Sequence, residues 1–182
     1  MDLFAQAIGL VGMAVNISSF QCKKQKTALT LQLIGPVMFS VNMYLVGAGM
    51  GFLLNVIGIL RALTYLQAER IGPKLKYVNW AFTISYFAAY YLTFTVFGTA
   101  PTWQNLLIEL LPLIGMIAMT IGFAKGTPKY IRLYGYINSP CWLIYNCFRF
   151  TLGGILCEIV CLISITTAAI RLDRKIERNE SI

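Results

Sequence analysis

The stretch TALTLQLIGPVMFSVNMYLVGAGMGFLLNVIGIL, residues 27–60, contains no charged residue. A hydrocarbon core about 30 Å thick is crossed by roughly 20 apolar helical residues, so this run holds two crossings. The segment Gly47-Ala-Gly-Met-Gly51 divides them and is typical of a short hairpin. Backbone groups in lipid must bond within their own segment, and the run lacks the strict alternation of a strand. We therefore expect both crossings to be helices.

The rest of the chain is equally poor in charge. Hydrophobic residues make up 58% of it and charged residues 12%, against about 25% charged residues in a typical soluble domain. Residues 3–22 and 77–108 also lack charged side chains. With breaks at glycine and proline, the sequence predicts an all-α integral membrane protein of seven transmembrane helices, at residues 4–21, 28–46, 50–68, 77–97, 105–124, 130–149 and 152–171.

The positive charges follow every second predicted helix. Thirteen of the fifteen Lys and Arg residues lie in four short segments, residues 23–26, 70–76, 125–132 and 171–178. Cytoplasmic loops carry such an excess, so we expect the N-terminus outside and the C-terminus in the cytoplasm, which needs an odd number of crossings. The net charge of +8 is then a topology signal. Because the charges are scattered, we expect no nucleic-acid partner.

An internal repeat is found when the sequence is compared with itself at an offset of 103 to 104 residues. The offset carries the first three predicted helices onto the last three, and both copies then cross the membrane in the same direction. We therefore expect two parallel triple-helix bundles, residues 1–69 and 105–172, joined by a linker helix in 70–104 and followed by a charged tail, 173–182. The pairs in register are Gly12-Met13 with Gly115-Met116, Phe20 with Phe123, Pro36 with Pro140, Asn42 with Asn146, Tyr44 with Phe148, Gly49 and Gly51 with Gly153 and Gly154, Asn55 with Glu158, and Arg61 with Ser164.

This three-one-three plan resembles the SWEET sugar transporters and their PQ-loop (MtN3-like) relatives. The first repeat carries the resemblance: Phe20-Gln21 and a basic turn stand where that group has Pro-Gln, Pro36 is central in the second helix, and Asn55 lies in the third. The second repeat departs from it, with Phe123-Ala124 at the motif position.

A narrower resemblance covers nearly the whole chain. The runs Ser19-Phe-Gln-Cys-Lys-Lys-Gln-Lys-Thr27 and Leu54-Asn-Val-Ile-Gly-Ile-Leu-Arg61 are similar to the YgjV family of bacterial inner membrane proteins. This resemblance implies a location in the bacterial inner (plasma) membrane. It brings no activity with it.

Two polar residues inside predicted helices are the first candidates for a binding site. A charged side chain at a helix centre costs about 2.5–3.5 kcal/mol on insertion scales, so Glu158 should face a cavity or a partner. Asn55 is its repeat mate, and the resemblance to SWEET proteins implies that this asparagine contacts the substrate. We expect both to face a polar cavity between the bundles. The structural alternative is that Glu158 pairs with Arg149 near the outer face.

Three further residues complete the predicted substrate-binding set. Arg61 lies six residues, about 9 Å, deeper than Asn55 along the same helix. It either binds an anionic group, pairs with Glu158 as a gate, or bonds carbonyls at the inner rim. Asn16 belongs to a stripe of small residues that favours close helix packing, and it can still face the cavity. Trp142 is positioned in the sixth helix to stack on a sugar ring.

Four residues are hinge candidates, which the resemblance to SWEET proteins implies. Pro36, Pro112 and Pro140 each lie inside a predicted helix, where a proline removes a backbone hydrogen bond. Gln21 is the glutamine of the motif position.

The sequence predicts neither a metal site nor a cofactor. There is no histidine, and the five cysteines, mostly within predicted helices, are expected to act as small hydrophobic residues. No hydrolase, metalloprotease or phosphate-loop motif is present, so we expect no enzymatic activity. The leading hypothesis is a carrier of a small polar solute, sugar-like or other, that works by alternating access. The alternative is a receptor or sensor on the same scaffold, since fold does not fix function.

Overall fold

The computed structural model describes residues 3–173, and within them the chain is entirely helical. Seven long helices account for most of it: α1 (Leu3–Phe20), α2 (Gln25–Leu45), α3 (Gly49–Leu66), α5 (Leu75–Thr95), α6 (Trp103–Ala124), α7 (Pro128–Phe148) and α8 (Leu152–Ala168). A short helix α4 (Ala68–Ile71) and a 3-10 turn (Gly72–Lys74) connect α3 to α5, and a π-helical turn (Ala169–Asp173) continues α8.

The seven helices predicted from the sequence are confirmed, with ends that differ by three residues or fewer. The sequence did not predict α4. Four helices are long and apolar enough to cross a membrane: Lys26–Leu45, Gly49–Leu66, Trp103–Ala124 and Leu152–Arg171. The other three long helices, α1, α5 and α7, have 18, 21 and 21 residues, which is about 27 to 32 Å at 1.5 Å per residue.

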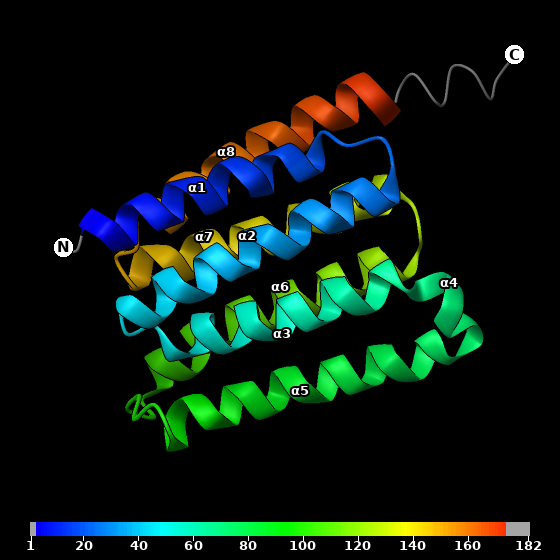
Figure 1. Cartoon of the computed structure of the whole chain (residues 1–182). Helices are drawn as coiled ribbons and strands as arrows, with labels where there is room; N and C mark the ends of the chain where they lie inside the picture. Colours follow the sequence, from blue (N-terminus) through cyan, green and yellow to red (C-terminus); the bar gives the residue numbers. More distant parts are fainter. Residues whose placement is uncertain (1–2, 174–182) are drawn as a thin grey trace, which may run out of the picture.

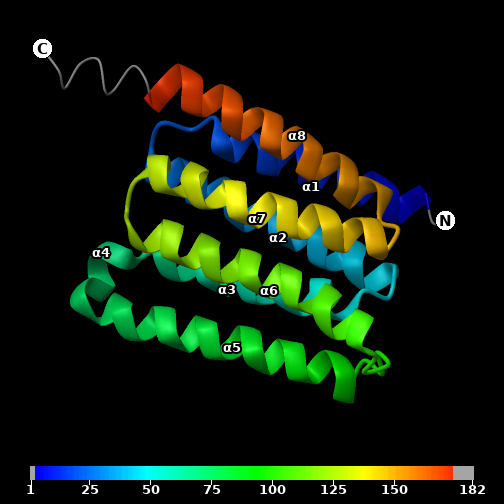
Figure 2. The same cartoon turned by 180° about the vertical axis from the view of Figure 1, so that it is seen from behind.

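The helices form two layers of three, with α5 at one edge (Figure 1). One layer holds α1, α2 and α3, and the other holds α8, α7 and α6, seen from its own side in Figure 2. Within each layer the middle helix, α2 or α7, packs against both neighbours, and between layers α1 packs against α8 and α3 against α6. Helices α1, α3, α6 and α8 run in one direction, whereas α2, α5 and α7 run in the other.

The turns after α2 and α7 are closed by the same hydrogen bonds, shifted by 103 residues. Gly47 and Phe150 occupy equivalent places in these turns, and both have positive φ, 73° and 52°. Because this conformation costs a side chain roughly 1–2 kcal/mol, Phe150 is the strained member of the pair. The equivalent backbone bonds are Val46 N to Asn42 O and Arg149 N to Tyr145 O, Gly47 N to Tyr44 O and Phe150 N to Cys147 O, and Ala48 N to Met43 O and Thr151 N to Asn146 O.

The two seams between the layers are related by the same offset. At the first seam, Arg61 of α3 donates to the Thr120 hydroxyl of α6 across 3.4 Å. At the second, the Ser164 hydroxyl of α8 donates to the Ile17 carbonyl of α1, also across 3.4 Å. Ser164 and Thr120 lie 103 residues after Arg61 and Ile17. Equivalent positions therefore make equivalent contacts, although the side chains differ.

The α1–α8 seam carries further polar contacts between segments that are far apart in the sequence. Gln21 donates through Nε2 to the Ser164 hydroxyl (2.6 Å) and carbonyl (3.0 Å). Its Oε1 accepts from Arg171 at 2.8 Å. Near the middle of the helices, Asn16 Nδ2 approaches Cys161 Sγ at 3.7 Å. These contacts tie the first long helix to the last.

Most of the described cations lie at one end of the helices, which we call the cation end; Arg61 is buried inside α3. The cation end comprises the α1–α2 turn, the α4 region, the α6–α7 turn and the end of α8 (Figure 1). Arg149 lies at the opposite end, and residues 174–178 of the predicted basic tail are outside the described part. The interior is packed with apolar side chains toward both ends. One cluster near the cation end contains Tyr65, Phe123 and Ile165, and one toward the opposite end contains Met50, Leu54 and Tyr145.

Candidate functional site

A polar cavity of about 70 Å³ lies between the two layers. All six helices of the layers contribute to its walls, and α5 does not. At 1.5 Å per residue, the lining residues of α3 lie about 9 to 18 Å from the start of that helix, near the middle of its length. The lining residues are Asn16, Pro36, Phe39, Met43, Asn55, Arg61, Met116, Met119, Asn138, Ser139, Trp142, Asn146, Gly154 and Glu158.

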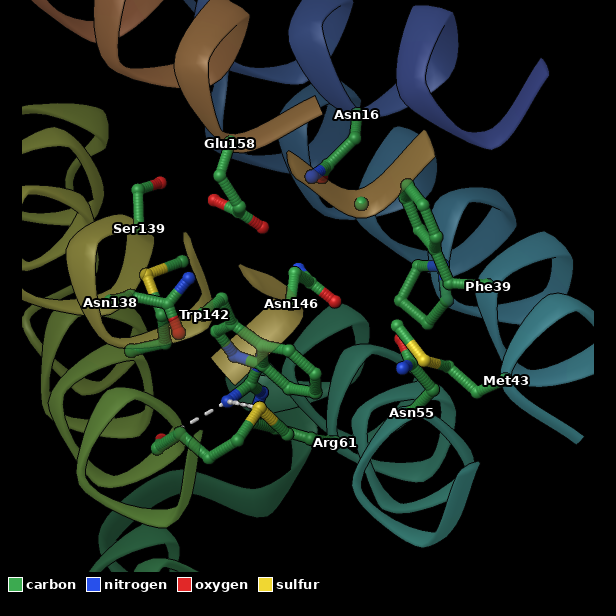
Figure 3. Close-up of a pocket in the computed structure, with 14 residues that line it drawn as sticks. Asn16, Phe39, Met43, Asn55, Arg61, Asn138, Ser139, Trp142, Asn146 and Glu158 are labelled. Carbon is green, nitrogen blue, oxygen red and sulfur yellow. Dashed lines mark hydrogen bonds between the residues drawn. The ribbon is translucent and has the colours of Figure 1, made fainter. Parts of the chain in front are cut away.

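Glu158 projects from α8 into this cavity (Figure 3). Glu158 is only 9% exposed, and it lines the cavity. Ser139 and Asn138 of α7 lie beside it. Asn146, about two turns further along α7, faces it across the cavity. A carboxylate is therefore surrounded by neutral polar groups, an arrangement suited to recognising a hydrogen-bond donor.

Arg61 lies at the other side of the cavity, and contacts from α5 and α6 hold it there (Figure 3). Its Nη1 lies 3.2 Å from the Met116 carbonyl oxygen and 3.4 Å from the hydroxyls of Tyr86 and Thr120. Its guanidinium carbon is 4.8 Å from the ring centroid of Phe123, a cation–π distance. These partners fix the guanidinium group on the α6 wall. Arg61 thus bonds one carbonyl, as one of the predicted alternatives has it, but at the cavity wall in the middle of α6 and not at the inner rim.

Several residues that line the cavity carry buried polar atoms without a hydrogen-bond partner. Among the described residues, five buried side-chain nitrogen or oxygen atoms have no hydrogen-bond partner in the protein. Three of them belong to cavity-lining residues: Arg61 Nε, Asn138 Oδ1 and Ser139 Oγ. Arg61 and Ser139 are 5% and 1% exposed. Because a buried polar group without a partner costs about 1–3 kcal/mol, their concentration at one place indicates a site that is completed by a ligand.

Glycines let the helices approach closely enough to form these walls. A Cβ atom added at Gly154 of α8 would lie 2.6 Å from Cγ and Oδ1 of Asn146. A Cβ at Gly115 of α6 would lie 2.9 Å from Asn138 Oδ1 and 3.3 Å from the Asn138 backbone. Both cavity asparagines of α7 are thus seated against a glycine of a neighbouring helix.

The structure brings together all five residues predicted for substrate binding. Asn55, Glu158, Arg61, Asn16 and Trp142 line the same cavity. Their role in binding stays a prediction. Trp142 packs edge-to-face on Tyr145, with ring centroids 5.7 Å apart. Asn55 donates through Nδ2 to the Gly51 carbonyl at 2.8 Å, and so lines the wall with its amide partly engaged.

The predicted hinge residues are more dispersed. Pro36 lines the cavity from α2. Pro112 and Pro140 lie inside α6 and α7 and are not among the lining residues. Gln21 lies just after α1, at the α1–α8 seam near the cation end. All three helices continue through their prolines.

Sequence reasoning missed two features. Asn138 and Ser139 were not singled out, although the run Asn138-Ser139-Pro140 is polar in the middle of a predicted helix. Glu109 was missed as well: it is 1% exposed in α6 and forms an ion pair with Arg149 of α7. The alternative that Arg149 pairs with Glu158 is therefore wrong. A signal existed, because Arg149 is the one arginine at the end opposite the basic segments.

The described residues contain no group of three or more Cys, Asp or Glu side chains that would hold a metal ion. Cys157 and Cys161 lie on one face of α8 with their sulfur atoms 3.9 Å apart.

Comparison with curated proteins and with solved structures found no match. The sequence model of the Imp-YgjV family, described as bacterial inner membrane proteins, matches residues 3–176. With nearly its whole length matched, the chain belongs to this family of bacterial inner membrane proteins.

Proposed function

We propose that the protein is a carrier of a small polar solute, which binds in the cavity between the two layers and crosses by alternating access. The observation that carries the proposal is the buried Glu158, which faces a polar cavity lined by all six layer helices. An intramembrane carboxylate facing a cavity is typical of solute and ion pathways. The proposal includes no catalytic role.

The proposed architecture is seven crossings in two parallel repeats, 1–69 and 105–172, with α5 as the linker. The offset of 103 residues in the turn bonds and seam contacts supports it. Parallel repeats related by an axis along the membrane normal form one class of transporter, with the site at the repeat interface. The polar cavity between the two layers supports this proposal, because the two proposed repeats form one layer each.

In this mechanism the structure is a state with a small binding cavity. Its cavity of about 70 Å³ is much smaller than the pockets of about 300–1,000 Å³ that hold drug-sized ligands. Apolar clusters pack on either side of it, one toward the cation end and one toward the opposite end. Opening toward the cation end requires the layers to part where Gln21 bonds Ser164. Pro36, Pro112 and Pro140 are the proposed points of bending, because a helix yields where a backbone hydrogen bond is missing.

Two-sided access to the cavity tests this function without knowledge of the solute. In a chain whose five cysteines are replaced by alanine, Asn55→Cys is treated with a charged, membrane-impermeant methanethiosulfonate in right-side-out and in inverted vesicles. A carrier should be labelled from both sides, because its site opens to each in turn. Ile84→Cys, on a residue 66% exposed at the lipid-facing side of α5, is the control and should resist labelling from either side.

Labelling of Asn55→Cys from one side alone would favour a receptor function and would rule out the carrier function. Uptake of radiolabelled amino acids, sugars and polyols into proteoliposomes then identifies the solute. Saturable uptake that empty liposomes lack is the expected result.

Orientation is a separate prediction. The cation end should face the cytoplasm, because short cytoplasmic loops carry the excess of Lys and Arg. Alkaline phosphatase fused after Ile182 should be inactive and green fluorescent protein at the same point fluorescent. The opposite pattern would invert the proposed topology while leaving the helix arrangement intact.

A further inference from the structure

The cavity has two chemically different poles, which Figure 3 shows on opposite sides with Asn146 and Trp142 between them. We infer that the solute bound here is a small zwitterion, with a primary ammonium group at Glu158 and a carboxylate at Arg61. This inference names the substrate class of the proposed carrier and rests on the same cavity.

The first pole accepts hydrogen bonds. Glu158 contributes a carboxylate, and the Ser139 hydroxyl of α7 lies beside it. A primary ammonium group has three N–H donors and no acceptor, so it fits the two oxygens of this carboxylate and the neighbouring hydroxyl oxygen. Its charge also favours the ionised form of the carboxylate. A hydroxyl of a neutral solute brings a single donor to the same place.

The second pole donates hydrogen bonds. Arg61 carries five N–H donors, of which those on Nη1 meet the Met116 carbonyl and the hydroxyls of Tyr86 and Thr120. Its Nε has no partner. A carboxylate binds a guanidinium group through two parallel N–H donors. Because α5 and α6 already hold the arginine in place, little side-chain entropy is lost when the anion binds.

The two poles favour a solute that carries both charges over one that carries a single charge. A lone cation would pair with Glu158 and leave Arg61 without an anionic partner. A lone anion would pair with Arg61 and leave Glu158 without a cationic partner. A solute that carries both charges a short distance apart serves both poles at once.

The test is a binding measurement, which is independent of transport. Radiolabelled glycine is bound to the purified full chain in nanodiscs, with methylammonium, acetate and glycolate as unlabelled competitors. Glycine should bind saturably and compete better than methylammonium or acetate, which each reach one pole. Glycolate, which lacks the ammonium group, should compete about ten- to a hundredfold more weakly than glycine, the range expected when hydrogen bonds to a charged group are lost.

Two variants separate the poles. Glu158→Gln should weaken the binding of glycine and of methylammonium by about ten- to a hundredfold. Arg61→Lys keeps the charge but loses the paired donors, so it should weaken the binding of glycine and leave the binding of methylammonium unchanged. The control is the double variant Glu109→Gln/Arg149→Met, which removes the other buried acid outside the cavity and should bind glycine as the native chain does.

Several results would overturn the inference. They are the lack of saturable binding for glycine, alanine and β-alanine, competition by glycolate equal to that by glycine, and glycine affinity that Glu158→Gln leaves unchanged. If Na⁺ alone competed with glycine, and if Glu158→Gln abolished that competition, the cavity would be a cation site instead. Glycine binding without uptake into proteoliposomes would leave the zwitterion site standing and refute the carrier, so the two proposals fail separately.

Discussion

Replacing Arg149 with methionine should destabilise the protein by about 3 kcal/mol, since removing one partner of a buried ion pair leaves the other charge uncompensated. Glu109 is 1% exposed in α6 and pairs with Arg149 at the end of α7. Because the side chain of Arg149 is 28% exposed, water replaces part of its interaction and the loss should fall at the lower end of the known range. Unfolding by SDS in mixed micelles measures the change.

The double variant Glu109→Gln/Arg149→Met is the matched control. It leaves no lone charge, so it should recover most of the stability and lie within about 1 kcal/mol of the native chain, as replacing whole buried pairs by neutral side chains often does. If the double variant were as unstable as the sum of its two single variants, the pair would not be coupled. The pair joins two helices of one layer, so its loss should leave solute binding in the folded fraction unchanged.

Gly154→Ala should destabilise the protein by about 2 kcal/mol, within the range for overpacking a well-packed core. Its new Cβ would lie 2.6 Å from Asn146, which is 2% exposed and accepts from the Thr151 hydroxyl at 2.6 Å. A buried side chain held in this way has little room to move. It would be pushed toward the cavity and reduce a volume of only about 70 Å³, so solute binding should fall together with stability.

Gly51→Ala, at the equivalent position of the first repeat, is the control. Its Cβ would meet Met43 Sδ at 2.9 Å and Cγ at 3.2 Å. This is the flexible end of an unbranched side chain, which moves at small cost. We expect a loss below about 1 kcal/mol. Equal losses of stability in both variants would contradict the argument that Asn146 has little room to move.

The positions of the helices follow from the sequence because lipid permits few alternatives. A charge-free run longer than a crossing must break at a turn, and the glycine and proline positions mark those turns. The offset of Pro36 and Pro140 indicated the repeat, and the turns at Gly47 and Phe150 repeat it in their backbone bonds. Helix α4 was not predicted because four residues carry no periodicity that distinguishes a turn from a helix.

The site was predicted only in part, for a physical reason. Asn55, Arg61 and Glu158 stand out because a polar side chain in lipid is costly on any face of a helix. Asn138 and Ser139 are less costly and share their helix with many aromatic and polar residues, so the direction in which they point depends on how α7 is rotated against α6 and α8. That rotation is set by close contacts such as Gly115 with Asn138, which join residues of different helices and leave no local pattern.

The α1–α8 seam bears on how the protein is made. Ribosomes add about 5–20 residues per second, so the 143 residues between Gln21 and Ser164 take roughly 7 to 30 s to synthesise. In the proposed topology, the polar groups of α1, Asn16 among them, enter the bilayer during that interval without the helix that receives them. The nascent chain therefore has a defined period in which its first helix needs a temporary partner, such as the insertion machinery or a membrane chaperone. Stalling synthesis just before α8 should prolong that association.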